Sequence, residues 1–343
     1  MSVLLAVAAF IVSLFLTKRF LDPASRFYIL DRPNDRSLHT HPTPRGGGLA
    51  ILLAIIICSL GSIFWFGQFP EPAYRWVAGA GFLVAAVSYL DDRFILTSAV
   101  RFIVHILAAV LVAFAGLVVN RLELPGLVFS LPYWIDVIFT ILFVVWMLNL
   151  YNFMDGMDGL AGGMTVFGFG AFATMGWMEG HEIFFAVNLI VAAASAGFMV
   201  FNFPPARIFM GDVGSSTLGF LAAVFSLWGV RDGVFSFWVA VLVFSPFFAD
   251  ATVTLLRRLW RREKIWKPHK SHYYQRLVQS GWGHRKTVLA EYLIMFGCGL
   301  TAVIGMYETV VMQAAMLSGW VLFYIIFFFW VSWHASRHRH DPA

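Results

Sequence analysis

Long apolar segments follow one another along nearly the whole chain and limit its fold to one class. A helix needs about 20 residues to cross a hydrocarbon core of roughly 30 Å, and lipid leaves no other way to satisfy the backbone of such a segment. We therefore expect an all-α polytopic membrane protein with about eleven transmembrane helices. The expected spans are residues 3–17, 47–66, 74–90, 99–119, 133–151, 161–178, 182–201, 213–230, 233–256, 288–307 and 311–333.

The composition supports this class. Charged residues make up 13% of the 343 residues and hydrophobic residues 60%, whereas soluble domains carry about 25% charged residues. Such a chain could not coat a soluble globule with polar surface, which excludes an ordinary cytosolic enzyme, a disordered chain and a nucleic-acid-binding protein. Cys58 and Cys298 both lie in apolar segments and cannot form a disulfide framework. We expect membrane lipids around the protein and no polynucleotide partner.

The basic residues predict the orientation in the membrane. If eleven spans alternate sides, one set of loops carries 21 of the 24 Lys and Arg residues, and the other carries only Arg75, Arg121 and Arg231. Cytoplasmic loops are enriched in Lys and Arg, so we expect a periplasmic N-terminus and a cytoplasmic C-terminus. The sequence shows no repeat, and we expect a single integral-membrane domain at 1–335 with a short basic cytoplasmic tail at 336–343.

The unusual polar clusters all fall on the expected cytoplasmic side, which indicates a one-sided active site. The first is Asp91-Asp92, where the third span ends. Adjacent residues of a helix point about 100° apart, so we expect the two carboxylates to have separate roles. The alternative is a pair that only marks the water boundary, where ionisable groups cost little.

A second cluster follows the fifth span. Asn149, Asn152, Asp155 and Asp158 recur every three residues, and on a helix the first three would share a face. Oxygen ligands without a thiolate suit Mg²⁺ and the phosphates that it binds. The alternative is a capped helix end with a solvated turn.

A third cluster opens the eighth span with Phe209 and Asp212. Asp212 could simply cap that helix. A helix N-terminus also favours phosphate, and an aspartate beside it could hold a metal that bridges to that phosphate. Phe209 could stack on a base, although lipid contact or core packing is the usual role of such a residue.

The longest cytoplasmic loop, 257–287, carries ten Lys and Arg residues. Such a basic segment usually reflects topology and attraction to anionic lipid, and we interpret Arg257, Arg258, Arg261 and Arg262 in this way. The segment from His269 to His272 differs, because two imidazoles and the Lys270 ammonium are suited to anionic phosphates or to proton transfer near pH 7. A zinc site is only weakly indicated there.

The first cytoplasmic loop ends in a proline- and glycine-rich segment, 42–48, which contains Arg45. Its glycines could form a nest of backbone N–H groups that binds phosphate. The alternative is a glycine-rich entry into the second span.

Together these motifs are far more specific than any one of them. An Asp-Asp pair, an N-x-x-N-x-x-D-G-x-D-G run, an F-M-G-D-x-G-S run and a histidine-containing basic loop occur in that order. The chain resembles, over about 1–335, the polyprenyl-phosphate N-acetylhexosamine-1-phosphate transferases of glycosyltransferase family 4. This family is related to the phospho-N-acetylmuramoyl-pentapeptide transferases of peptidoglycan synthesis.

The resemblance implies a magnesium-dependent phosphoglycosyltransferase reaction at the cytoplasmic face of the bacterial inner membrane. A UDP-N-acetyl amino sugar gives its sugar-1-phosphate to undecaprenyl phosphate, and UMP leaves. The undecaprenyl-pyrophosphoryl-sugar then initiates a surface polysaccharide such as the O-antigen of lipopolysaccharide. Mn²⁺ could replace Mg²⁺, and the chain could form a homodimer.

The resemblance also implies roles for individual residues. It makes Asp212 a metal ligand, and Asp155 a catalytic group near the metal and the diphosphate. Asp91 and Asp92 would hold or deprotonate the lipid phosphate. The remaining implied roles are uracil contact by Asp158 and Phe209, phosphate or sugar contact by His269 and His272, and further substrate contacts by Asn149, Asn152, Arg45 and Lys270.

Two alternatives stay open. The pentapeptide branch has three consecutive histidines where this chain has His269-Lys270-Ser271-His272, so the loop resembles the O-antigen-initiating branch more closely. An ion-coupled secondary transporter is a different class of function. A transporter would place its ion sites near the bilayer midplane, between two repeated halves of the chain, whereas these acidic residues lie at span ends.

The mechanism of the transfer reaction also has two possibilities. The lipid phosphate could attack the donor directly, or the reaction could pass through a covalent aspartyl intermediate, and we prefer direct attack.

Overall fold

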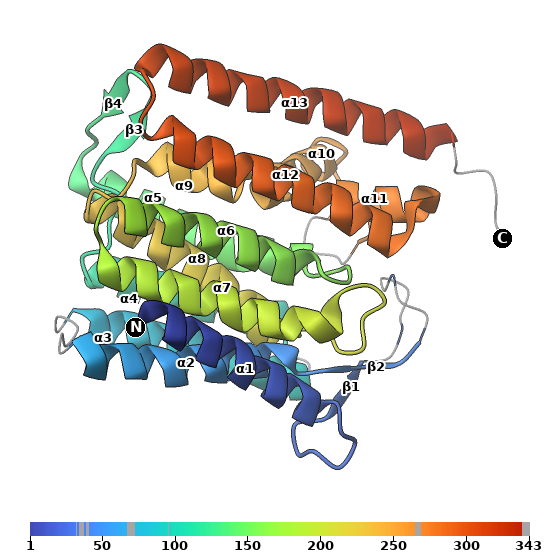
Figure 1. Ribbon diagram of the computed structural model, residues 1–343. Coiled ribbons are helices and arrows are strands. Elements are labelled where there is room, and N and C mark those ends of the chain that lie inside the picture. Colours follow the sequence, from blue (N-terminus) through green and yellow to red (C-terminus); the bar gives the residue numbers. More distant parts are fainter. Residues whose placement is uncertain are drawn as a thin grey trace.

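The computed structural model describes residues 1–31, 33, 38, 41–66, 73–94, 96–264 and 269–337 (Figure 1). Most of the expected tail at 336–343, from residue 338 onward, lies outside the described residues. Part of the first cytoplasmic loop also lies outside them. The described chain is mostly helical, as the apolar segments predicted.

Each expected span contains a helix in the structure. Among the described residues, seven helices are long and apolar enough to cross a membrane, and the bent pair α9–α10 would make an eighth. These features are those of a multi-pass membrane protein. The helices are α1 (Ser2–Phe20), α2 (Gly47–Phe66), α3 (Tyr74–Phe94), α4 (Ser98–Phe114), α5 (Tyr133–Met154), α6 (Leu160–Met178), α7 (Glu182–Asn202), α8 (Asp212–Arg231), α9 (Phe237–Val243), α10 (Ser245–Trp260), α11 (Tyr273–Leu277), the π-helix η1 (Val278–Trp282), α12 (Gly283–Gly305) and α13 (Val310–Arg337).

Two of the expected boundaries are wrong. The span expected at 233–256 is broken at Phe244 into α9 and α10, which are bent by 80°. Pro246 lies at the start of α10, where proline is tolerated because the first N–H groups of a helix have no partner within it. The span expected to reach residue 119 ends at Phe114, and Gly116 then turns the chain with φ of 81°.

Small residues let the helices that carry the polar clusters approach one another closely. A Cβ atom on Gly219 of α8 would lie 2.6 Å from the Met147 carbonyl oxygen of α5. A Cβ atom on Gly48 of α2 would lie 2.2 Å from the Gly214 Cα of α8. Such contacts are typical of helices packed in lipid, and they fix α2, α5 and α8 against one another.

Two short antiparallel hairpins lie at opposite ends of the helical bundle (Figure 1). Strand β1 (Ile29–Asp31) pairs with β2 (Thr43–Arg45), and β3 (Leu122–Leu124) pairs with β4 (Leu127–Phe129). The sequence did not predict these strands. Strand β2 leads directly into α2 and forms a bridge from Arg45 to Phe209, so it connects the first loop to the segment before α8.

Candidate active site

The ends of α3, α5 and α8 meet at the β1–β2 end of the bundle and bring polar side chains together. The Arg101 Nη1 atom, in the first turn of α4, lies 2.8 Å from Asp91 Oδ2 and 3.0 Å from Asp212 Oδ2. Asn152 Nδ2 donates to the other oxygen of Asp212 at 2.9 Å. Residues that are far apart in the sequence thus share one cluster around Asp212.

Asp92 contacts different partners from Asp91. Its carboxylate is buried and accepts hydrogen bonds from the backbone N–H groups of Asp212 and Val213, both at 3.1 Å. The Arg45 guanidinium lies 3.6 Å from the same carboxylate and donates to the Asp92 carbonyl. Asp92 therefore holds the N-terminus of α8 in place, while Asp91 binds the Leu96 N–H and Arg101.

Asp155 follows α5 directly, and its carboxylate makes no hydrogen bond or ion pair with any residue that the structure describes. Desolvation and the negative charges of Asp212, Asp92 and Asp158 raise its pKa well above the usual range. A cation at this position would relieve that repulsion.

These residues fit a magnesium ion. The described residues include no group of three or more His, Cys, Asp or Glu side chains arranged to hold a metal. However, Mg²⁺ usually takes only one or two protein carboxylates and completes its coordination with water and substrate phosphates. Asp155 and Asp212 supply two carboxylates of this kind, so the donor set suits Mg²⁺ bound together with a diphosphate.

A cavity of about 440 Å³ lies beside this cluster and is lined by Asp158 and Phe209, together with His284 and Arg285. One oxygen of Asp158 accepts a hydrogen bond from the Ala206 N–H at 3.0 Å, and the other lies 3.2 Å from His284 Nδ1. The structure thus places the two residues expected to contact uracil in one cavity.

The glycines before α2 do not form the phosphate-binding nest that we considered. The N–H groups of Gly46 and Gly47 donate to the Phe209 carbonyl, and the N–H of Gly48 donates to the Met210 carbonyl. Because these donors are already paired, the prediction of a nest is wrong. The glycines instead let α2 pack against the segment that begins α8.

The histidine loop lies against the chain that leads to Asp155. The Tyr274 hydroxyl donates to the Phe153 carbonyl at 3.1 Å, and the rings of His269 and His272 are 4.8 Å apart. His272 is buried, and its Nδ1 atom lies 3.2 Å from Asp250 Oδ1. Burial and the nearby His272 and Arg258 lower the pKa of His269 to about 4, so His269 is neutral at pH 7.

Asp250 is the main residue of this region that the sequence analysis missed. Its carboxylate is 3% exposed and accepts hydrogen bonds from the N–H groups of Tyr273 and Tyr274 at 2.9 and 3.0 Å. An acidic residue inside an apolar segment was the available signal. Arg101 was also missed, because it was counted only as a loop charge.

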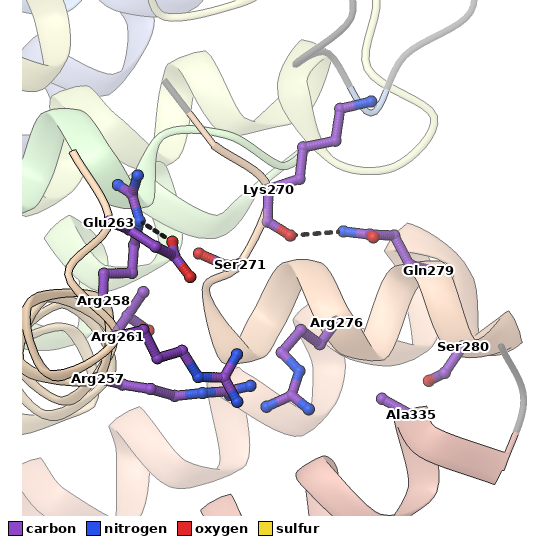
Figure 2. Close-up of a pocket in the computed structure, with 11 residues that line it drawn as sticks. Arg257, Arg258, Arg261, Glu263, Lys270, Ser271, Arg276, Gln279, Ser280 and Ala335 are labelled. Carbon is purple, nitrogen blue, oxygen red and sulfur yellow. Dashed lines mark hydrogen bonds and ion pairs between the residues drawn. The ribbon is translucent and has the colours of Figure 1, made fainter. Parts of the chain in front are cut away.

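Two predicted site residues do not join these contacts. Asn149 donates to the Val145 carbonyl of its own helix at 2.7 Å. The side chain of Lys270 points away from the neighbouring arginines (Figure 2), and its carbonyl accepts a hydrogen bond from Gln279. Within the described part of the chain, neither side chain makes a hydrogen bond or an ion pair with an aspartate.

Comparison with known proteins agrees with the arrangement of these motifs. Residues 74–230 match the family model of glycosyl transferase family 4. A probable undecaprenyl-phosphate N-acetylglucosaminyl 1-phosphate transferase of Bacillus subtilis is 33% identical over 331 residues, which cover 94% of this chain and 89% of the relative.

More distant relatives carry two kinds of name. The decaprenyl-phosphate N-acetylglucosaminephosphotransferase of Mycobacterium tuberculosis is 30% identical over 84% of this chain and 79% of its own length. A phospho-N-acetylmuramoyl-pentapeptide-transferase of Staphylococcus saprophyticus is 28% identical over 87% of this chain and 97% of its own length. The chain belongs to glycosyl transferase family 4.

Proposed function

We propose that this protein transfers the sugar-1-phosphate of a UDP-N-acetyl amino sugar to undecaprenyl phosphate and releases UMP. The observation that carries the proposal is the cluster around Asp212, which contacts Arg101 and Asn152 from two other helices. The names of the relatives support the same reaction class. In this proposal the lipid-linked product initiates a bacterial surface polysaccharide.

The proposed placement is an eleven-span protein of the inner membrane with its N-terminus in the periplasm and its C-terminus in the cytoplasm. The distribution of Lys and Arg along the sequence supports this orientation. The β1–β2 end of the bundle then faces the cytoplasm, where UDP-sugars are available, and the active site lies at the boundary between water and lipid.

In this proposal Asp155 and Asp212 hold Mg²⁺, which supplies charge neutralisation at the donor diphosphate when it is bound. Arg101 adds fixed positive charge beside Asp212, and Arg45 adds it beside the neighbouring Asp92. Asp158 and Phe209 orient the uracil in the cavity that they line. Phosphoryl transfer depends mainly on such positioning and charge stabilisation.

Direct attack by the lipid phosphate fits these contacts better than a covalent aspartyl intermediate. Both oxygens of Asp92 are occupied by backbone N–H groups, and those of Asp91 by Leu96 and Arg101. The lipid phosphate also needs little help to lose its proton at pH 7, because the second pKa of a phosphate monoester is about 6.

The experiment is an assay of purified protein with undecaprenyl phosphate, Mg²⁺ and a panel of UDP-sugars, scored by UMP release. UDP-N-acetylglucosamine is the first donor to test, and UDP-N-acetylmuramoyl-pentapeptide tests the alternative branch. We expect Asp212→Asn to lower kcat on the order of 10³-fold, because removing a key electrostatic group commonly costs 10²–10³-fold. The matched control is Asp232→Asn, at the exposed opposite end of α8. Full turnover by Asp212→Asn would disprove the metal assignment.

A further inference from the structure

A second cavity lies away from the aspartate cluster, where the end of α10 meets α11, η1 and the last turns of α13 (Figure 2). Its volume is about 360 Å³. Five of its lining residues are Lys or Arg, and only Glu263 is acidic. The proposed transfer reaction assigns no role to this cavity.

Much of the positive charge in this cavity is not compensated by protein groups. Glu263 is engaged by Arg258 at 2.9 Å. The guanidinium groups of Arg257 and Arg261 make no hydrogen bond or ion pair with any described residue. Their guanidinium groups point toward the same space as that of Arg276 (Figure 2).

Guanidinium groups gathered in this way are suited to a phosphate group. The planar N–H fork of arginine matches the spacing of two phosphate oxygens, and the charge strengthens each hydrogen bond. Arg276 is already positioned by a 2.9 Å hydrogen bond to Ser332 of α13. The cavity therefore has two arginines held by protein groups, Arg258 and Arg276, and two whose guanidinium groups are available to a ligand, Arg257 and Arg261.

The surface beside the cavity indicates that the phosphate belongs to a lipid. On α10, Leu256 and Leu259 are 57% and 58% exposed, and Trp260, between the two arginines, is 90% exposed. On α13, Phe329 and Trp333 are also exposed. Tryptophan at a helix end is typical of the membrane–water interface, so acyl chains could lie on this apolar surface while the headgroup enters the cavity.

We propose that this cavity binds the phosphate headgroup of an anionic phospholipid of the surrounding membrane, with Arg257 and Arg261 as its main contacts. Basic pockets between helices on the cytoplasmic side are known to suit such headgroups. The proposal rests on the cytoplasmic placement proposed above but not on the transfer reaction, because binding is measured without a donor or turnover.

The test is native mass spectrometry of the full-length protein in neutral detergent, titrated with dioleoyl-phosphatidylglycerol or dioleoyl-phosphatidylcholine. We expect the Arg257→Gln/Arg261→Gln variant to bind phosphatidylglycerol roughly tenfold or more weakly, because each cation near an anionic lipid contributes about fivefold in affinity. The variant Arg257→Lys/Arg261→Lys should keep most of the binding. The control Lys18→Gln/Arg19→Gln removes two cytoplasmic charges from the end of α1 and should bind like the wild type.

Three outcomes would overturn the proposal. The first is equal affinity for phosphatidylglycerol in the wild type and the Gln variant. The second is displacement of phosphatidylglycerol by equimolar inorganic phosphate, which would assign the cavity to a free anion. The third is a Gln variant that loses binding of undecaprenyl phosphate but keeps binding of phosphatidylglycerol, which would assign the cavity to the acceptor substrate. If transferase activity were absent but the binding pattern held, only the proposed function would fail.

Discussion

Asp92 and Asp250 have the same structural role at two places in the molecule, and only Asp92 stands in a recognisable motif. Asp92 accepts hydrogen bonds from the first two backbone N–H groups of α8, and Asp250 accepts them from the first two of α11. Both side chains are almost fully buried, at 4% and 3% exposure. A carboxylate at a helix N-terminus is stabilised by the helix dipole and by unpaired N–H groups.

The two sites differ in what each aspartate positions. Asp92 fixes the start of α8, whose first residue is Asp212. Asp250 fixes the start of α11 and also binds the ring of His272. In both regions a buried carboxylate holds the start of a helix, which begins at Asp212 in one case and directly after His272 in the other. A carboxylate within a motif therefore need not be the one that contacts the substrate.

Of the two helix-capping aspartates, Asp92 should give the larger effect when it is changed to Asn. The amide group cannot accept both N–H groups, and an unpaired buried donor costs about 1–3 kcal/mol. We expect the start of α8 to shift, with kcat reduced on the order of 10²-fold, as a small misplacement of reacting groups can cause. The measurement is kcat together with the thermal unfolding midpoint in detergent.

Asp31→Asn is the control for this change, because Asp31 lies 3.9 Å from the same Arg45 but caps no helix. It should behave nearly like the wild type. If Asp92→Asn lost activity at unchanged thermal stability, Asp92 would act on the substrate itself, and the likeness to Asp250 would fail.

A smaller effect is expected for Asp250→Asn. The change removes a charge-assisted hydrogen bond worth about 1.5–3 kcal/mol, which corresponds to roughly 10–100-fold in kcat if it acts through His272. In a protein that already carries His272→Gln, Asp250→Asn should lower kcat only slightly further. The control Thr254→Val removes only the 3.0 Å hydrogen bond from the Thr254 hydroxyl to Asp250. Equal losses in both backgrounds would mean that Asp250 merely holds the loop.

The sequence predicted the helices well because a membrane span must be long, apolar and helical. It did not predict the bend at Phe244, since apolar residues continue directly on both sides of the break and only Pro246 marks it. Strands of three residues, as in the β1–β2 hairpin, are too short to leave a periodic pattern. Local composition thus predicted where the helices lie, but not the bend within a helical span or the short strands between spans.

The sequence predicted the site residues that belong to recognisable motifs. It did not predict the single residues outside those motifs that contact them. Asp91, Asn152 and Asp212 belong to recognisable clusters, and their side chains share contacts in the structure. Arg101 meets Asp212 across a separation of 111 residues. Asp250 meets Tyr273 across 23 residues. Neither pairing leaves a local signature, because such contacts depend on how the helices pack.

The smallest expected effect concerns the pH dependence of stability through His269. Its pKa is lowered to about 4, first by burial and then by the positive charges of His272 and Arg258, which outweigh Glu263 and Asp250. The unfolded chain, with an ordinary histidine pKa near 6.5, therefore binds more protons between pH 6.5 and pH 4. Stability is then lost as the pH falls through this window.

His269→Gln should reduce the loss of stability between pH 7 and pH 5 by on the order of 1 kcal/mol, after allowance for screening of a half-exposed side chain. Thermal unfolding in detergent at the two pH values measures it, with His41→Gln as an exposed control. Asp250 contacts the His272 ring directly but acts on His269 only at a distance. An unchanged acid sensitivity in His269→Gln would mean that the surroundings of His269 do not make its ring harder to protonate in the folded protein, and that its titration does not contribute to the loss of stability.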